Sequence, residues 1–246
     1  MMILTGKTIM SALRPPFPYG GEFISQFLFC LRLCWFPLLI STVAFGYGAP
    51  GLQAANFLVL FGALDRLGGF FVLASIREFA PTVDAIVLAG VAGTAITADL
   101  GARKIREELD ALQVLGVDPV KNLVVPRFLA LMLVTGLFDI YAVIFGVFGG
   151  ILATVVYHAP LGPFFATFLT NASTTDLWGS VLKTTAFGAI IAIVCCYKGM
   201  TASGGAEGVG RAVNQAVVTS FLGIFAFNYV FTQTLLATHP EITVIK

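Results

Sequence analysis

Ionisable side chains within long apolar stretches of a sequence are candidates for function, because each is costly in a bilayer unless it is paired. Asp84 and Asp139 lie in two such stretches, and Lys183 lies in a third, from which it can pair with either aspartate. Arg77 and Glu78 are adjacent, near the start of the stretch that contains Asp84. The pattern favours a structural ion pair over a proton relay.

A second group of informative residues lies in a charged segment at 98–119, within a chain that otherwise has few charges. Apolar residues recur there at helical spacing, Gly116 suits a helix C-cap, and Pro119 stops any continuation. These features predict an amphipathic helix at 104–116. Its apolar stripe comprises Ile105, Leu109, Leu112 and Leu115, and its acidic residues are Glu107, Glu108 and Asp110.

This helix could simply lie on a membrane surface, as many amphipathic loop helices do. The inner leaflet is anionic, however, and would repel the three acidic side chains. A protein partner suits these charges better. In transport ATPases whose membrane and motor parts are separate chains, such a loop helix lies in a groove of the motor chain and transmits its movement.

Other kinds of chemistry find little support in the residue pattern. The four cysteines form two close pairs that suit neither a disulfide framework nor a zinc site, since the two histidines lie far away in the sequence. No nucleophile with a nearby base is evident, so we predict no catalytic residue, metal site or cofactor. The net charge of +1, without a basic run interleaved with aromatic residues, argues against a nucleic-acid partner.

The composition defines the class of protein. Hydrophobic residues make up 58% of the 246 residues and charged residues only 11%, whereas soluble domains carry roughly 25% charged residues. A bilayer solvates apolar faces at no cost, and a helix that crosses it needs about 20 mostly apolar residues. The sequence therefore predicts an all-α integral membrane protein with a single transmembrane domain.

Five stretches are long enough to cross a bilayer, and two shorter helices accompany them. The spans are predicted at about 35–61, 69–98, 128–156, 177–197 and 213–237. An interfacial helix is predicted at 22–33, and a short helix on the outer interface at 161–171. The glycines and Pro50 at 46–51 predict a kinked or partly unwound first span. In the third span, Gly146 and Gly150 allow close helix approach, within the subunit or across a dimer.

The positions of the basic residues predict the orientation of the chain. With the N-terminus in the cytoplasm, ten of the 14 Lys and Arg residues lie in cytoplasmic segments, while Arg66 and Lys246 lie outside. Loops that stay in the cytoplasm carry such an excess. The N-terminal residues also lack a secretory pattern. We therefore expect a cytoplasmic N-terminus and a C-terminus on the periplasmic or extracellular side.

Three motifs resemble the MlaE/YrbE permeases of bacterial lipid ABC transporters, the Mla and Mce systems. The first is Arg77-Glu78-Phe79-Ala80-Pro81 followed by AGVAGTAITADLG at 89–101. The second is EELDAL at 107–112, with GVDP at 116–119 and VPR at 125–127. The third combines Lys183 with YKG at 197–199 and GVGRAV at 208–213. The sequence at 98–108 is most similar to that of the actinobacterial YrbE branch. Val91 differs from the Mla-type members, which often carry Arg at this position.

The resemblance implies the permease subunit of an ATP-driven lipid transporter in the bacterial plasma membrane. It implies a second permease copy, as a homo- or heterodimer, and a cytoplasmic ABC ATPase bound through the helix at 105–116. It also implies periplasmic MCE-domain proteins on the outer face, where Arg77 and Glu78 would serve the lipid path or a partner contact. The chain itself is then no enzyme. The alternative is a secondary transporter or channel for a small hydrophobic molecule, which should show inverted repeats or a polar midplane site.

Overall fold

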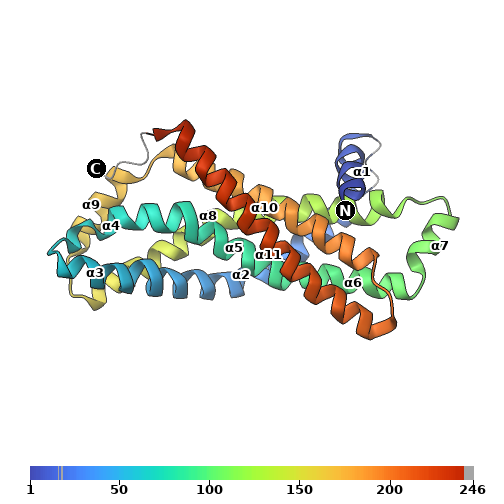
Figure 1. Cartoon of the computed structure of the whole chain (residues 1–246), viewed down its shortest axis with the longest axis horizontal. Helices are drawn as coiled ribbons and strands as arrows, with labels where there is room; N and C mark the ends of the chain where they lie inside the picture. Colours follow the sequence, from blue (N-terminus) through green and yellow to red (C-terminus); the bar gives the residue numbers. More distant parts are fainter. Residues whose placement is uncertain (16, 18, 241–246) are drawn as a thin grey trace. The chain divides into compact units, whose positions relative to one another are not determined.

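The computed structural model describes residues 1–15, 17 and 19–240, and these residues form helices and no strand. Pro16, Pro18 and Lys246 lie outside the described residues. Figure 1 traces the helices in chain order, from blue to red. Five of them, within the described part of the chain, are long and apolar enough to cross a membrane, which confirms the predicted all-α membrane fold.

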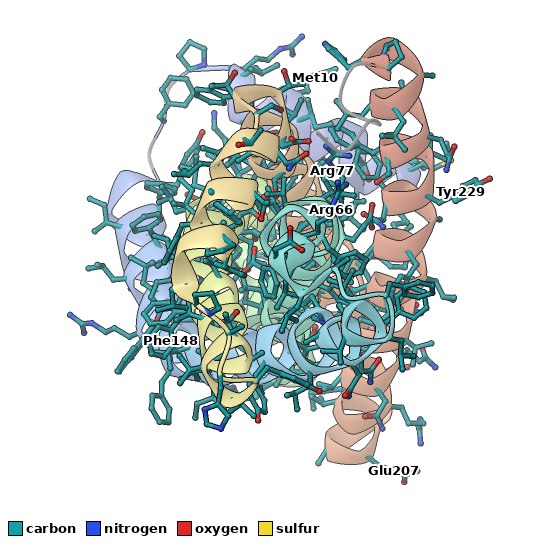
Figure 2. The ribbon with its side chains drawn as sticks, turned by 90° about the vertical axis from the view of Figure 1, so that its left-hand side faces the viewer. Met10, Arg66, Arg77, Phe148, Glu207 and Tyr229 are labelled. Atoms are coloured by element: carbon teal, nitrogen blue, oxygen red, sulfur yellow. The ribbon has the colours of Figure 1, made fainter. Side chains whose placement is uncertain are left out.

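The five spans are longer than the sequence stretches that predict them. They cover Gly20–Leu60, Leu64–Ile105, Val120–Val156, Thr174–Met200 and Gly205–Thr238. Each helix continues past its apolar core into polar residues, because nothing in the sequence ends the helix where the hydrocarbon would end. Apolar side chains such as Phe148 and Tyr229 project from the outside of the ribbon, as expected of a protein solvated by lipid (Figure 2).

The spans are assembled from several helical segments. The first comprises α2 (Gly20–Gly46), the π-helical η1 (Tyr47–Gln53) and α3 (Ala54–Leu60). The second comprises η2 (Leu64–Arg66), α4 (Leu67–Phe71), the π-helical η3 (Val72–Phe79), α5 (Ala80–Leu88), the π-helical η4 (Ala89–Gly93) and α6 (Thr94–Ile105). The third comprises the π-helical η5 (Val120–Val124) and α8 (Val125–Val156), and the last two are α10 (Thr174–Met200) and α11 (Gly205–Thr238).

The chain divides into two compact units. Unit 1 comprises Met1–Cys34, Ile86–Thr135 and Thr185–Ala226. Unit 2 comprises Trp35–Ala85, Gly136–Thr184 and Phe227–Lys246. Each unit contains sections of all five spans, so residues that are far apart in the sequence meet within a single unit.

Two expectations about the first span need correction. The interfacial helix predicted at 22–33 is not a separate element but the first part of α2. No glycine or proline occurs between residues 22 and 36 to end it, and Pro37 is accommodated inside the helix. The partly unwound form predicted for 46–51 does not occur, and the kinked form stays a prediction. The stretch widens into η1, with Pro50 inside it, and a π-helical turn of this kind accommodates a residue that disturbs the regular hydrogen-bond pattern.

The core of unit 2 lies beneath a short helix, α9 (Leu161–Asn171), which has the bounds predicted from the sequence. Phe164 of α9 and Phe71 of α4 are buried against each other, with ring centroids 5.9 Å apart. Gly68 allows this close approach, because a β-carbon there would overlap the carbonyl oxygen of Phe164. Aromatic contacts therefore fix α9 against the second span.

Glycines also bring the first and third spans into backbone contact within unit 2. A β-carbon on Gly46 would overlap the carbonyl oxygen of Gly146, and one on Gly149 would lie 2.5 Å from the backbone nitrogen of Tyr47. A β-carbon on Gly150 would lie 2.6 Å from the ring of Phe71. Gly146 and Gly150 thus pack against helices of the same chain.

Unit 1 begins with a helix that the sequence patterns do not reveal, α1 (Met2–Leu13). It packs against η5, where Lys7 forms an ion pair with Asp118 at 3.1 Å. Thr8 is buried on the same helix, whereas Met2 and Ile3 are exposed. The N-terminal residues are therefore attached to the segment that follows the predicted amphipathic helix.

Candidate functional sites

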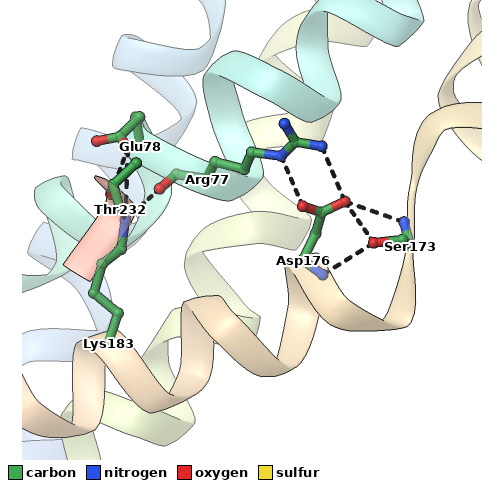
Figure 3. Close-up of polar contacts among 6 residues, drawn as sticks. All are labelled: Arg77, Glu78, Ser173, Asp176, Lys183 and Thr232. Carbon is green, nitrogen blue, oxygen red and sulfur yellow. Dashed lines mark hydrogen bonds and ion pairs between the residues drawn. The ribbon is translucent and has the colours of Figure 1, made fainter. Parts of the chain in front are cut away.

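A polar cluster within unit 2 joins three spans. Arg77 and Glu78 lie in the π-helical segment η3, Asp176 and Lys183 lie near the start of α10, and Thr232 lies near the end of α11. Figure 3 shows the two ion pairs that these residues form. Because η3 is π-helical, its side chains depart from the regular helical spacing, a feature that is frequent at functional sites.

Arg77 is held by Asp176 through two hydrogen bonds. Its Nε lies 2.7 Å from Oδ1 and its Nη2 lies 3.4 Å from Oδ2. The side chain of Asp176 is buried, and Ser173 binds it in turn: the Ser173 hydroxyl donates to Oδ2 at 2.8 Å, and the Asp176 amide donates to that hydroxyl at 3.1 Å. Ser173 and Asp176 therefore form a reciprocal cap at the start of α10 that also orients Arg77.

Glu78 is held by three groups. The Thr232 hydroxyl donates to its Oε1 at 2.9 Å, Asn228 donates to its Oε2 at 2.8 Å, and Lys183 Nζ lies 3.8 Å from Oε1. Lys183 is buried and also donates to the carbonyl oxygen of Arg77. Each of the two adjacent charges of η3 therefore has its own partner of opposite charge.

The deeper acidic residues are not the ion-pair partners of Lys183. Asp139 accepts a hydrogen bond from the Ser180 hydroxyl at 2.9 Å. Asp84 is buried, and neither of its carboxyl oxygens has a hydrogen-bond partner among the described residues. Lys183 is therefore ion-paired with Glu78, and not with Asp84 or Asp139 as the sequence suggests.

Sequence reasoning missed Asp176, Asn228 and Thr232. The fourth span was predicted to begin at residue 177, which left Asp176 outside it. A signal was nevertheless present, since Ser173 followed by Asp176 three residues later is a capping pattern that marks the start of a helix. Asn228 and Thr232 are four residues apart on one face of α11, and no sequence pattern indicates that Glu78 lies opposite them.

The charged segment of unit 1 differs in detail from the predicted helix at 104–116. Helix α6 ends at Ile105, and Glu107 adopts a left-handed conformation with φ of 60°. A separate helix, α7, then covers Glu108–Val114. Because Glu107 interrupts the helical path, the predicted single stripe is divided.

The side chains around α7 are therefore distributed in two directions. Leu109 is buried within unit 1, and Leu112 is half-buried. Leu115 remains 76% exposed and Val114, which the stripe did not include, is 89% exposed. Gly116 has a φ of 77°, as expected of a cap. Ile105 is exposed as well, so the chain itself leaves the apolar side chains of Ile105, Val114 and Leu115 uncovered.

Ion pairs fix this segment to the rest of unit 1. Lys104 pairs with Asp110 at 2.9 Å across the turn between α6 and α7. At the base of the segment, buried Arg127 lies 2.7 Å from Asp99 of α6 and 3.5 Å from Glu22 of α2. Arg127 thus connects three spans at the point where the loop leaves them.

Five apolar spans, charges paired inside the helical bundle and a structured charged loop between two spans define a multi-pass membrane protein. The family model described as Permease MlaE matches residues 23–234. The chain therefore belongs to the MlaE permease family. This assignment agrees with the motifs that the sequence contains.

The names of similar proteins are consistent with membership of this family. A "Probable ABC transporter permease protein" of Synechocystis is 37% identical over 72% of this chain and 68% of its own length. One of Rickettsia typhi is 32% identical over 92% of this chain and 87% of its own length. The chloroplastic protein TRIGALACTOSYLDIACYLGLYCEROL 1 of Arabidopsis thaliana is 34% identical over 70% of this chain and 49% of its own length. The chain is accordingly the permease subunit of an ABC transporter.

Proposed function

We propose that this permease moves a hydrophobic lipid between the membrane or periplasmic MCE-domain proteins and the cell. The energy would come from ATP hydrolysed by a separate cytoplasmic chain. The observation that carries the lipid assignment is an apolar groove within unit 2. The name of the Arabidopsis relative, which contains that of a glycolipid, supports the same class of substrate.

The groove lies between the first and third spans and has a volume of about 600 Å³. Its walls are hydrocarbon and aromatic side chains, and none of the lining residues carries a charge. Such walls suit an acyl chain or a sterol, since hydrocarbon needs apolar contact and no polar anchor. The lining residues are Leu39, Ile40, Val43, Ala44 and Tyr47 on one wall, and Phe145, Phe148, Leu152, Val155 and Val156 on the other.

We expect Phe148→Gln to lower the amount of lipid that co-purifies with the transporter several-fold. Phe148 lines the groove and is half exposed, so the change places an amide in the lipid path without emptying the core. Lipid extracted from the purified protein would be counted per chain by mass spectrometry. Phe225→Gln is the matched control, because Phe225 is equally exposed on α11 and does not line the groove. Equal lipid content in the two variants would contradict the proposed path.

The ATPase contact is proposed at the surface of Ile105, Val114 and Leu115. These apolar side chains are uncovered. On the same segment Glu108 and Asp110 are paired with Arg106 and Lys104, and Glu107 adds an exposed carboxylate that an anionic leaflet would repel. A protein groove with basic edges would satisfy both features. We further propose a bacterial plasma membrane location with a cytoplasmic N-terminus, a second permease copy, and MCE-domain proteins on the outer face.

A further inference from the structure

Asp84 of α5 has a buried carboxyl group without a hydrogen-bond donor or cation, among the described residues, that would stabilise its charge. It is 0% exposed, and neither oxygen has a hydrogen-bond partner among the residues that the structure describes. An ionised carboxylate in such surroundings loses its hydration without gaining a donor or a cation in exchange. Asp84 therefore requires a compensating group that the proposed transport function does not supply.

That group cannot come from another molecule packed against the outside of this chain. Asp84 has no accessible surface even in the isolated chain, so a second permease copy, an MCE-domain protein or a lipid headgroup cannot reach it in this conformation. Helix α5 carries no other charged residue. Any compensation must come from within the chain.

Two basic side chains of unit 2 are largely buried, Arg77 and Lys183, and both are already ion-paired. From η3, Arg77 pairs with Asp176 of α10. Lys183 of α10 pairs with Glu78 of η3 and interacts electrostatically with Asp139 as well. Asp139 of α8 is a second acid, and it offers Asp84 no positive charge. Asp139 itself has the Ser180 hydroxyl as a donor, so the two aspartates differ in their support.

From this arrangement we infer that Asp84 is an intramembrane proton-binding site, occupied by a proton in this conformation. The neutral acid removes the cost of a buried charge at Asp84, whereas Asp139 has the Ser180 hydroxyl and Lys183 to support a charge. The proton can leave only after unit 2 opens to admit water or moves Lys183 toward α5. Proton exchange at Asp84 would therefore report a conformational change of the permease.

Isotope-edited infrared spectroscopy of the transporter in lipid nanodiscs tests this inference directly. The chain would be labelled with aspartate that carries ¹³C in the side-chain carboxyl group, which shifts every aspartate band and separates aspartate from glutamate. Asp99, Asp110, Asp118 and Asp176 are ion-paired and Asp65 is exposed, so each of these five carboxyl groups has a cation or solvent beside it. A labelled band of a protonated carboxylic acid at neutral pH can then arise only from Asp84 or Asp139.

We expect that band in the unaltered chain, its loss in Asp84→Asn and its persistence in Asp139→Asn. Asp110→Asn, which removes an exposed aspartate paired with Lys104, is the control and should leave that band in place. Absence of a protonated aspartate band from the unaltered chain would overturn the inference, whether or not the variants fold. Survival of the band in a folded Asp84→Asn protein would also overturn it, because the proton would then reside on Asp139.

Discussion

Asp176 illustrates how one buried side chain can serve two neighbours. It accepts two hydrogen bonds from Arg77 and one from the Ser173 hydroxyl, and these contacts occupy both carboxylate oxygens. Replacing one member of such a buried pair leaves the other charge without compensation, which is far more costly than never having had the pair. The pair is therefore a sensitive point for stability.

We expect Asp176→Asn to lower the free energy of unfolding by about 3–5 kcal/mol, the range for a buried ion pair that loses one partner. The amide can still cap α10 in part, but it leaves the Arg77 guanidinium buried without a counter-charge. Unfolding in mixed micelles, followed by circular dichroism, measures the change. Asp65→Asn removes an exposed aspartate and should leave the midpoint unchanged. Equal midpoints for both variants would contradict a stabilising role of the pair.

For single residues, the sequence predicts which side chains belong to the polar cluster better than it predicts which residues they contact. Arg77, Glu78 and Lys183 were identified because a charge within an apolar stretch needs an explanation. Their partners Asp176, Asn228 and Thr232 lie about 100 to 154 positions away from η3. No periodicity encodes that separation, since it results from the packing of spans two, four and five.

Among the elements, the loop between the second and third spans shows most clearly where the predicted and observed helices differ. The apolar periodicity at 105–115 and the cap at Gly116 correctly indicate helical structure. The interruption at Glu107 was not predicted, because a left-handed glutamate in a helical pattern has no distinctive sequence signal. As a result, Leu109 faces the chain while Val114 and Leu115 face outward.

We expect Leu115→Arg to abolish co-purification of the ATPase and to leave membrane insertion unchanged. Leu115 lies in the uncovered apolar surface and packs little against its own chain, so a cation there disturbs the proposed interface and not the fold. Affinity purification of the tagged permease would measure the ratio of the two chains. Leu169→Arg, at an exposed apolar position of α9 in unit 2, should retain the ATPase. A normal ratio with Leu115→Arg would place the contact elsewhere.

At the scale of the whole molecule, composition and apolar run length predicted the class and the number of spans. Both follow from the thickness of the bilayer and not from details of packing. The ends of the spans were predicted less well, because amphipathic extensions such as 20–34 and 205–212 are helical without being strongly apolar. Helix α1 escaped detection for the related reason that a 12-residue helix carries too little apolar periodicity.

The proposed orientation can be tested with single cysteines, because all four native cysteines are buried. Thr170→Cys in α9 should react with a membrane-impermeant maleimide added to intact cells. Glu207→Cys at the start of α11 should react only after the membrane is permeabilised. Both positions are exposed, so access and not burial decides the result. The opposite labelling pattern would reverse the orientation, and the unaltered chain gives the background.

The glycines that join the first and third spans are chain neighbours of residues that line the apolar groove. Gly46 and Gly149 permit direct backbone contact there, and backbone atoms cannot move aside as a flexible side chain can. The distance between the two walls is consequently set by the main chain itself. If the groove is the lipid path, as proposed, its two walls form a gauge of fixed width and not a cleft that adapts to its ligand.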